Sequence, residues 1–234
     1  VVVLAVVVGV GLWLQNRNKP GALPVAIPVA AAGVQYPVAA QGDAIVTGSP
    51  QTPTTIDVYE DFMCPVCGQF EKLYHQRLTQ AAADGKAKVV YHPVAILDEL
   101  SVPPGYSTLA AGATYCATAA DTFPRFHDSL FAAQPPEGGH GWTIAQLQQL
   151  GRSLGAGDAF AGCVQACAKQ RVTTATATAG QYIRGLRPDP RFVTPSVVVH
   201  GAIIDLRDEG WLDQALRPTR PRPRALSVTT PGPP

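Results

Sequence analysis

The chain has 234 residues and a net charge of +1, because 18 Lys and Arg oppose 17 Asp and Glu. This balance provides no basic stripe to neutralise phosphates, so nucleic-acid binding is not expected. With 46% hydrophobic residues the chain can build the core of one domain, for which roughly 180 residues remain once both ends are set aside.

An uncharged apolar run, VVVLAVVVGVGLWL, occupies residues 1–14. A spanning helix needs about 20 apolar residues. Because the chain begins at Val rather than Met, we expect this run to extend further back, and we interpret it as part of a single-pass membrane anchor. The alternative is a secretory signal segment, but its nearest small-residue cleavage site, VAAAG at 29–33, lies far downstream.

Proline-rich segments flank the expected domain. Residues 15–42 are predicted to form an extended Pro/Ala-rich linker, and residues 218–234 a disordered Pro-rich tail. The folded domain is therefore expected at 43–217.

Apolar periodicity predicts the elements of this domain. In chain order we expect strands at 43–48 and 54–62, a helix from Cys67 to ADGK, a strand at 87–97, helices at about 106–120, 121–133, 143–154 and 157–171 with a continuation toward Gly185, a strand at 194–204 and a final helix in GWLDQALR. A helix that connects two strands implies a parallel pair. The pattern indicates an α/β fold with a helical insertion at about 104–184.

The pair Cys64 and Cys67, in the stretch DFMCPVCGQF, has C-x-x-C spacing at the start of the first helix. Unpaired backbone N–H groups and the helix dipole at that end favour a thiolate on Cys64, and Pro65 suits the first turn. Cys67, one turn further along, is the expected resolving cysteine. Half a zinc site is the alternative, but CVQAC at 163–167 does not supply a matching second half.

The motif YEDFMCPVCGQFE, the segment VTPSVVV and the helical insertion resemble the DsbA-like branch of the thioredoxin superfamily, in its membrane-anchored form from high-GC bacteria. This resemblance implies a thioredoxin-like fold in which a cis Pro195 faces the two cysteines. It also implies substrate contacts by Pro65, Val66, Thr194 and Pro195. Val66 cannot donate a side-chain hydrogen bond to the thiolate. Glu60 and Asp61 are expected to be solvated loop carboxylates.

Three cysteines lie outside the pair. An i, i+4 spacing on one helix is poorly suited to a bond between Cys163 and Cys167, which leaves Cys116 to pair with either of them. The resemblance favours a structural disulfide between Cys116 and Cys163. Cys167 is then a buried apolar residue or a reactive extra thiol. The five histidines show no convincing ligand spacing, so no metal is expected.

The resemblance implies a thiol:disulfide oxidoreductase that introduces disulfides into reduced exported proteins through its C-P-V-C pair, outside the cytoplasm. It needs no cofactor beyond the cysteines, and its implied reoxidant is a membrane protein of the vitamin K epoxide reductase type. A monomer is expected, because nothing resembles a dimerisation domain. The alternatives are an isomerase or reductase of the same fold, or a non-catalytic anchored module that binds extended chains.

Overall fold

The computed structural model describes residues 25–166, 169–187 and 191–217. The predicted anchor and tail, and Cys167, lie outside these residues. Within the described ranges, no helix is long and apolar enough to cross a membrane.

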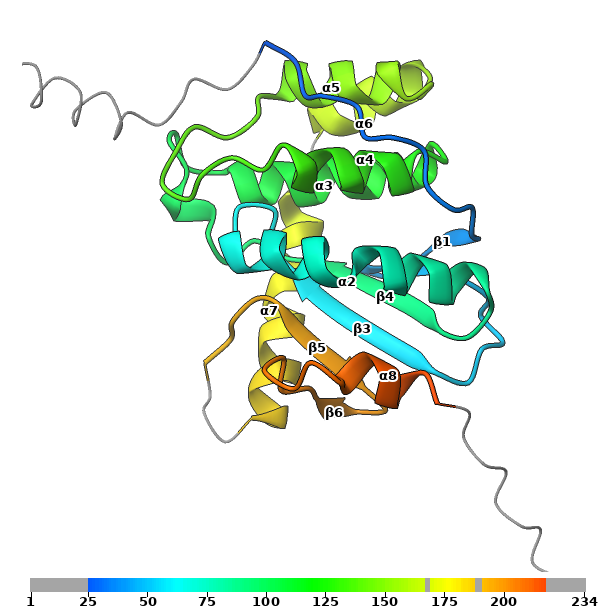
Figure 1. Ribbon diagram of the computed structural model, residues 1–234. Coiled ribbons are helices and arrows are strands. Elements are labelled where there is room, and N and C mark those ends of the chain that lie inside the picture. The colour runs from blue at the N-terminus through cyan, green and yellow to red at the C-terminus, as the bar shows by residue number, and fades with distance from the viewer. Residues whose placement is uncertain (1–24, 167–168, 188–190, 218–234) are drawn as a thin grey trace, which may run out of the picture.

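A six-stranded sheet forms the centre of the fold, in the order β1-β2-β4-β3-β5-β6 (Figure 1). Its strands are β1 (Val38–Gln41), β2 (Ala44–Thr47), β3 (Thr55–Glu60), β4 (Lys88–Pro93), β5 (Ser196–Val199) and β6 (Ala202–Ile203). β3 and β4 pair in parallel, as predicted, and the other pairs are antiparallel. The predicted late strand is divided into β5 and β6 by a turn, where His200 and Gly201 have φ values of 52° and 77°.

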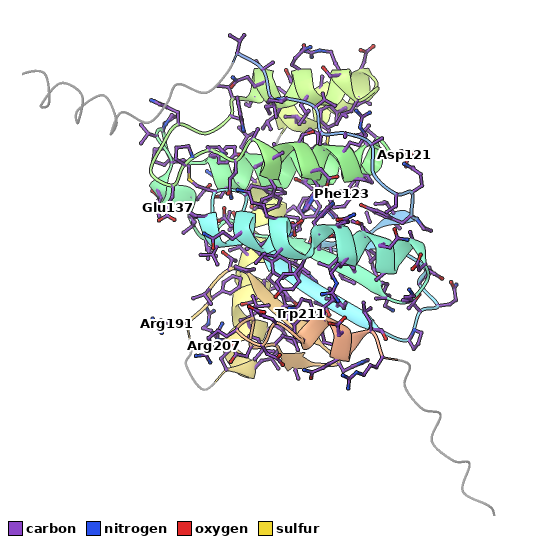
Figure 2. The ribbon with its side chains drawn as sticks, in the orientation of Figure 1. Asp121, Phe123, Glu137, Arg191, Arg207 and Trp211 are labelled. Carbon is purple, nitrogen blue, oxygen red and sulfur yellow. A yellow bond between two sulfur atoms is a disulfide. The ribbon has the colours of Figure 1, made fainter. Side chains whose placement is uncertain are left out.

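Helices surround this sheet and build a second layer beside it. They are α2 (Pro65–Ala83), the short 3-10 helix η1 (Asp98–Leu100), α3 (Tyr106–Ala119), α4 (Phe123–Ala132), α5 (Ile144–Ser153), α6 (Asp158–Ala166), α7 (Lys169–Leu186) and α8 (Trp211–Ala215). α2 and α8 lie on one side of the sheet and α7 on the other, while α3 to α6 gather at one end (Figure 1). Trp211 of α8 packs on Phe70 and Tyr74 of α2 (Figure 2). Along the chain, α3 to α7 all lie between β4 and β5.

One expectation about the chain's course stays untested and another is wrong. The predicted continuation of the helix at 157–171 toward Gly185 passes through residues 167 and 168, which the structure does not describe, and α6 and α7 lie on either side of them. α6 packs on α3 and α5, whereas α7 packs on α3 and β4, so the two segments have different partners.

The expectation that is wrong concerns the predicted linker at 15–42. Part of it is folded, because β1 lies within it and pairs with β2. Upstream of β1, Ile27 is buried in the core of the helical layer, and Ala30 N–H donates to Ser129 Oγ at 2.9 Å. This stretch contacts α4 and α5 through its apolar side chain and its backbone groups. These contacts could not be predicted from its Pro/Ala-rich composition. The blue segment in Figure 1 accordingly runs along these helices before it enters the sheet.

Candidate functional site

Cys64 is the N-cap residue of α2, in extended conformation with φ −72° and ψ 116°. Pro65 follows as the first helical residue, where its missing N–H has no intrahelical partner to lose. The Cys64 side chain thus lies at the end of the helix that carries unpaired N–H groups and the positive end of the dipole. The local sequence dictates this placement without long-range contacts.

Cys67 lies one turn into the helix and is completely buried, whereas Cys64 is 7% exposed. Both are free thiols in this structure. The backbone N–H of Asp61 donates to Cys67 Sγ at 3.5 Å. The cysteine that meets solvent is therefore the first of the pair, as an attacking or attacked sulfur requires.

The predicted partner segment reaches the same place from the far end of the chain. The Thr194–Pro195 peptide is cis, and Cys64 Sγ donates to Thr194 O at 3.3 Å. Pro195 also lines a cavity of about 400 Å³ together with residues from β6 and the loop after it. Pro65 and Val66 are exposed beside Cys64. The structure thus brings together the cysteine pair and all four residues expected to contact substrate.

The environment separates the pKa values of the two thiols. The pKa of Cys64 falls from 9.0 to about 6, chiefly through a hydrogen bond from the Cys67 thiol, while burial opposes the shift. The Thr194 side chain and the backbone N–H groups of Val66 and Cys67 lower it further, whereas the bond to Thr194 O is made only by the protonated thiol. Burial, followed by the neighbouring Cys64, raises the pKa of Cys67 well above its ordinary value. Near neutral pH the dithiol form therefore carries its thiolate on Cys64.

Glu60 and Asp61 are not solvated loop carboxylates, because both are completely buried. Asp61 accepts hydrogen bonds from Met63 N–H at 2.9 Å, Leu97 N–H at 2.9 Å and Ser107 Oγ at 2.6 Å. It joins the cysteine loop to the start of the helical insertion. Burial raises the pKa of Asp61, and these hydrogen bonds oppose that shift. Glu60 instead meets His127, with Oε1 at 2.8 Å from Nε2.

Gln134, which sequence reasoning missed, holds the same loop from the end of α4. Its amide Nε2 donates to Cys64 O at 2.8 Å and Phe62 O at 3.2 Å. A Cβ on Gly68 would lie 2.2 Å from Gln134 Oε1, so a larger residue at position 68 forces the Gln134 side chain to shift. The only sequence signal was a glycine inside a helix, which suggests close packing without naming the partner.

Cys116 of α3 and Cys163 of α6 are joined by a disulfide, with Cα atoms 5.8 Å apart. This is the pairing implied by the resemblance. Cys116 is buried in the core of the helical layer, and the bond ties α6 to it.

Four residues missed as a group also meet between α2 and α4. Glu71, His75 and His127 have ligand atoms within 4.8 Å of one another, and Asp128 lies beside both imidazoles. Glu71 and His75 are four residues apart on one helix, a spacing that places them on one face. That signal was present in the sequence, but the partners on α4 were not predictable from it.

Comparison with known proteins agrees with this geometry. The profile of a family described as Thioredoxin matches residues 40–216. The structure of DsbA from Mycobacterium tuberculosis in its reduced form is similar, with 29% sequence identity, a TM-score of 0.58, and coverage of 70% of this chain and 85% of that chain. The MdbA thiol-disulfide oxidoreductase from Corynebacterium diphtheriae shares the fold at 22% identity, with a TM-score of 0.67 and coverage of 79% and 95%.

A curated relative is the serine/threonine-protein kinase PknE of Mycobacterium tuberculosis (strain H37Rv), which is 31% identical over 178 residues. The match covers 73% of this chain but only 31% of the relative, so the chain spans about a third of that protein's length. The extent of the profile match, together with the fold shared with solved DsbA structures, decides the assignment. The chain belongs to the Thioredoxin family, and its fold is that of the DsbA-like thiol-disulfide oxidoreductases.

Proposed function

We propose that this protein is a disulfide oxidase that acts outside the cytoplasm and introduces disulfides into reduced exported proteins. The observation that carries the proposal is the division of the two thiols: Cys64 is reachable and has a pKa of about 6, whereas Cys67 is buried and has a raised pKa. A low-pKa thiol is a good leaving group, so a mixed disulfide through Cys64 resolves readily toward the oxidised substrate.

The reaction begins from the Cys64–Cys67 disulfide. A substrate thiolate attacks Cys64 Sγ, forming a mixed disulfide as the Cys64–Cys67 bond breaks and Cys67 takes up a proton. A second substrate thiolate then attacks the substrate sulfur of the mixed disulfide and releases Cys64 as its thiolate. The substrate loses two electrons and gains a disulfide, and the Cys64–Cys67 pair gains those electrons as a dithiol.

The surface next to the sulfurs suits an extended chain. Val66 and Val193 are 54% and 38% exposed, and the cavity beside Pro195 is bordered by Arg187 and Arg207. β6 forms the edge of the sheet at this cavity. An unpaired strand edge accepts a further strand through main-chain hydrogen bonds, which do not depend on sequence. This supports action on many unfolded clients.

Location and reoxidation belong to the same proposal. The apolar run at 1–14 supports a membrane anchor that keeps the domain outside the cytoplasm. The reduced pair then requires an electron acceptor, for which we propose a membrane protein of the vitamin K epoxide reductase type. No further cofactor takes part in this scheme, and the protein acts as a monomer.

The test is oxidative refolding of a reduced client protein. In a buffer of reduced and oxidised glutathione, Cys64→Ser abolishes the catalysed oxidation of the client. In Cys67→Ala, oxidised glutathione forms a mixed disulfide with Cys64, a client thiolate displaces reduced glutathione, and the resulting client–Cys64 disulfide accumulates on non-reducing gels. Gln69→Ala is the matched control, because Gln69 is exposed on the same helix and its loss leaves both the cysteine pair and the Cys116–Cys163 disulfide intact. Refolding that is unchanged in both Cys64→Ser and Cys67→Ala contradicts oxidase activity and favours the peptide-binding module.

The match to PknE favours a second candidate, in which the cysteine pair reports the redox state as the sensor domain of a larger protein kinase. The two candidates differ in turnover. An oxidase supplied with oxidised glutathione converts many equivalents of reduced client per protein, whereas a sensor exchanges its own disulfide once and stops.

A further inference from the structure

A cluster of two imidazoles and three carboxylates lies between the first long helix and the helical insertion. Glu71 and His75 come from α2, His127 and Asp128 from α4, and Glu60 from the end of β3. His75 Nδ1 lies 2.7 Å from Glu71 Oε2, and His75 Nε2 lies 2.9 Å from Asp128 Oδ1. His127 Nδ1 lies 3.5 Å from the same Asp128 oxygen. Asp128 therefore bridges the two rings.

The cluster is buried and short of positive charge. The side chains of Glu71 and His127 are 5% and 1% exposed. Glu71 Oε1 and Glu60 Oε2 have no hydrogen-bond partner among the described residues. Three carboxylates face two imidazoles, so the carboxylates outnumber the groups of the cluster that can carry positive charge. Buried charges are normally paired or bound to a metal, so the unpaired oxygen of Glu71 calls for a cation.

Solvent reaches the cluster through a cavity of about 230 Å³. Glu71, His75 and Asp128 line this cavity, and the exposed Lys72 lies at its edge. The side chains of His75 and Asp128 are 25% and 21% exposed, so one side of the cluster is open to an ion. The ring of Phe123, which is buried, lies 5.4 Å from the ring of His127.

The donor set discriminates between metals. Imidazole nitrogens with one or two carboxylate oxygens suit zinc, whereas calcium and magnesium take oxygen ligands. Ligand atoms around a tetrahedral zinc lie about 3.3 to 3.5 Å apart. The donors of Glu71, His75 and His127 lie within 4.8 Å of one another, so side-chain shifts of roughly 1 Å bring them onto an ion.

A second feature of metal-binding histidines is also present. His127 Nε2 lies 2.8 Å from Glu60 Oε1, which leaves Nδ1 as the nitrogen directed toward Asp128. A carboxylate on the outer nitrogen orients the ring and raises its basicity as a ligand.

We propose that Glu71, His75, His127 and Asp128 form a zinc site that joins α2 to α4. The site is independent of the proposed disulfide chemistry, although α2 carries the reactive cysteine at its start. A bound ion links the helix that positions Cys64 to the helical insertion, and the folded protein gains stability with the logarithm of the zinc concentration above the dissociation constant.

The experiment uses the full chain with the Cys64–Cys67 disulfide formed, so that these thiolates are not competing ligands. After treatment with a chelator, zinc is titrated by calorimetry and the melting temperature is recorded. We expect one equivalent of zinc per chain and a higher melting temperature. His75→Gln and Asp128→Asn, both at partly exposed positions, weaken binding tenfold or more, and cobalt(II) shows a tetrahedral absorption spectrum only in the unaltered protein.

His92→Gln is the matched control, because His92 pairs with Asp57 at 2.8 Å in strands away from the cluster. It leaves zinc affinity unchanged. Melting of each metal-free variant verifies that it is folded before titration. The absence of stoichiometric zinc uptake by the oxidised chain, or equal uptake by His75→Gln and Asp128→Asn, overturns the proposal and leaves the cluster as a hydrogen-bonded network.

Discussion

Reduction of the Cys64–Cys67 disulfide is expected to stabilise the folded protein at pH 8 and to lose this effect toward pH 4. The pKa of Cys64 falls from 9.0 in its ordinary state to about 6 in the folded dithiol. A depressed pKa stabilises the folded state above the unfolded pKa, and this contribution disappears as the pH falls through the folded value. The stabilisation by Cys64 ionisation is therefore lost as the pH falls from about 9 to about 5.

The magnitude follows from the same shift. A pKa that falls from 9.0 to about 6 contributes about 4 kcal/mol when Cys64 is fully ionised in both states, and about 2.7 kcal/mol at pH 8. Solvent screening at the active-site surface reduces the latter to roughly 1–2 kcal/mol. For a domain of this size, that corresponds to a change of about 3–6 °C in melting temperature.

Thermal unfolding of the reduced and oxidised forms at pH 8, 6 and 4 measures this contribution. The Cys116–Cys163 disulfide is kept intact in both forms, as verified by mass after alkylation. Buried acids outside the cysteine pair titrate in both forms, so their contribution cancels in the difference between the two melting temperatures. We expect the reduced form to melt higher at pH 8, with a gap that narrows toward pH 4. We also expect the reduced protein to melt higher than Cys64→Ala at pH 8, by a margin that narrows toward pH 4 as Cys64 is protonated. An oxidised form that melts higher at every pH, by a constant amount, refutes the reasoning and indicates a reductant.

Three further predictions concern single positions. Val66→His places a donor beside the thiolate and lowers the Cys64 pKa by about one pH unit, measured from the thiolate absorbance during a pH titration; an unchanged pKa contradicts it. Gly68→Ala pushes against Gln134 and lowers the free energy of unfolding in urea by about 1–3 kcal/mol, whereas Gly162→Ala, also inside a helix but with open space around the added Cβ, does not lower it. Cys116→Ala removes a disulfide that spans 47 residues and lowers the free energy of unfolding by about 4 kcal/mol in the same assay. An unaltered urea midpoint contradicts this prediction.

Local chemistry was sufficient to predict the reactive end of α2. The C-x-x-C spacing, the proline after Cys64 and the apolar period of the helix act over a few residues, so they predict a cysteine at the N-cap and its partner one turn further along. The alternation of strand and helix likewise predicted the parallel pairing of β3 and β4. The approach of Thr194 to Cys64, across 130 residues, required the family resemblance in addition to the pattern.

Tertiary structure alone decided the burial of the acids, the fold of the segment before β2 and the cluster between α2 and α4. Asp61 is buried because its partners Leu97 and Ser107 lie 36 and 46 residues away, and Glu60 because His127 lies 67 residues away. Sequence patterns report periodicity and caps within a turn or a strand, and a carboxylate next to a cysteine motif has the same local pattern whether it is solvated or enclosed. Which groups enclose it depends on how the helical insertion packs against the sheet, and that packing is a property of the whole chain.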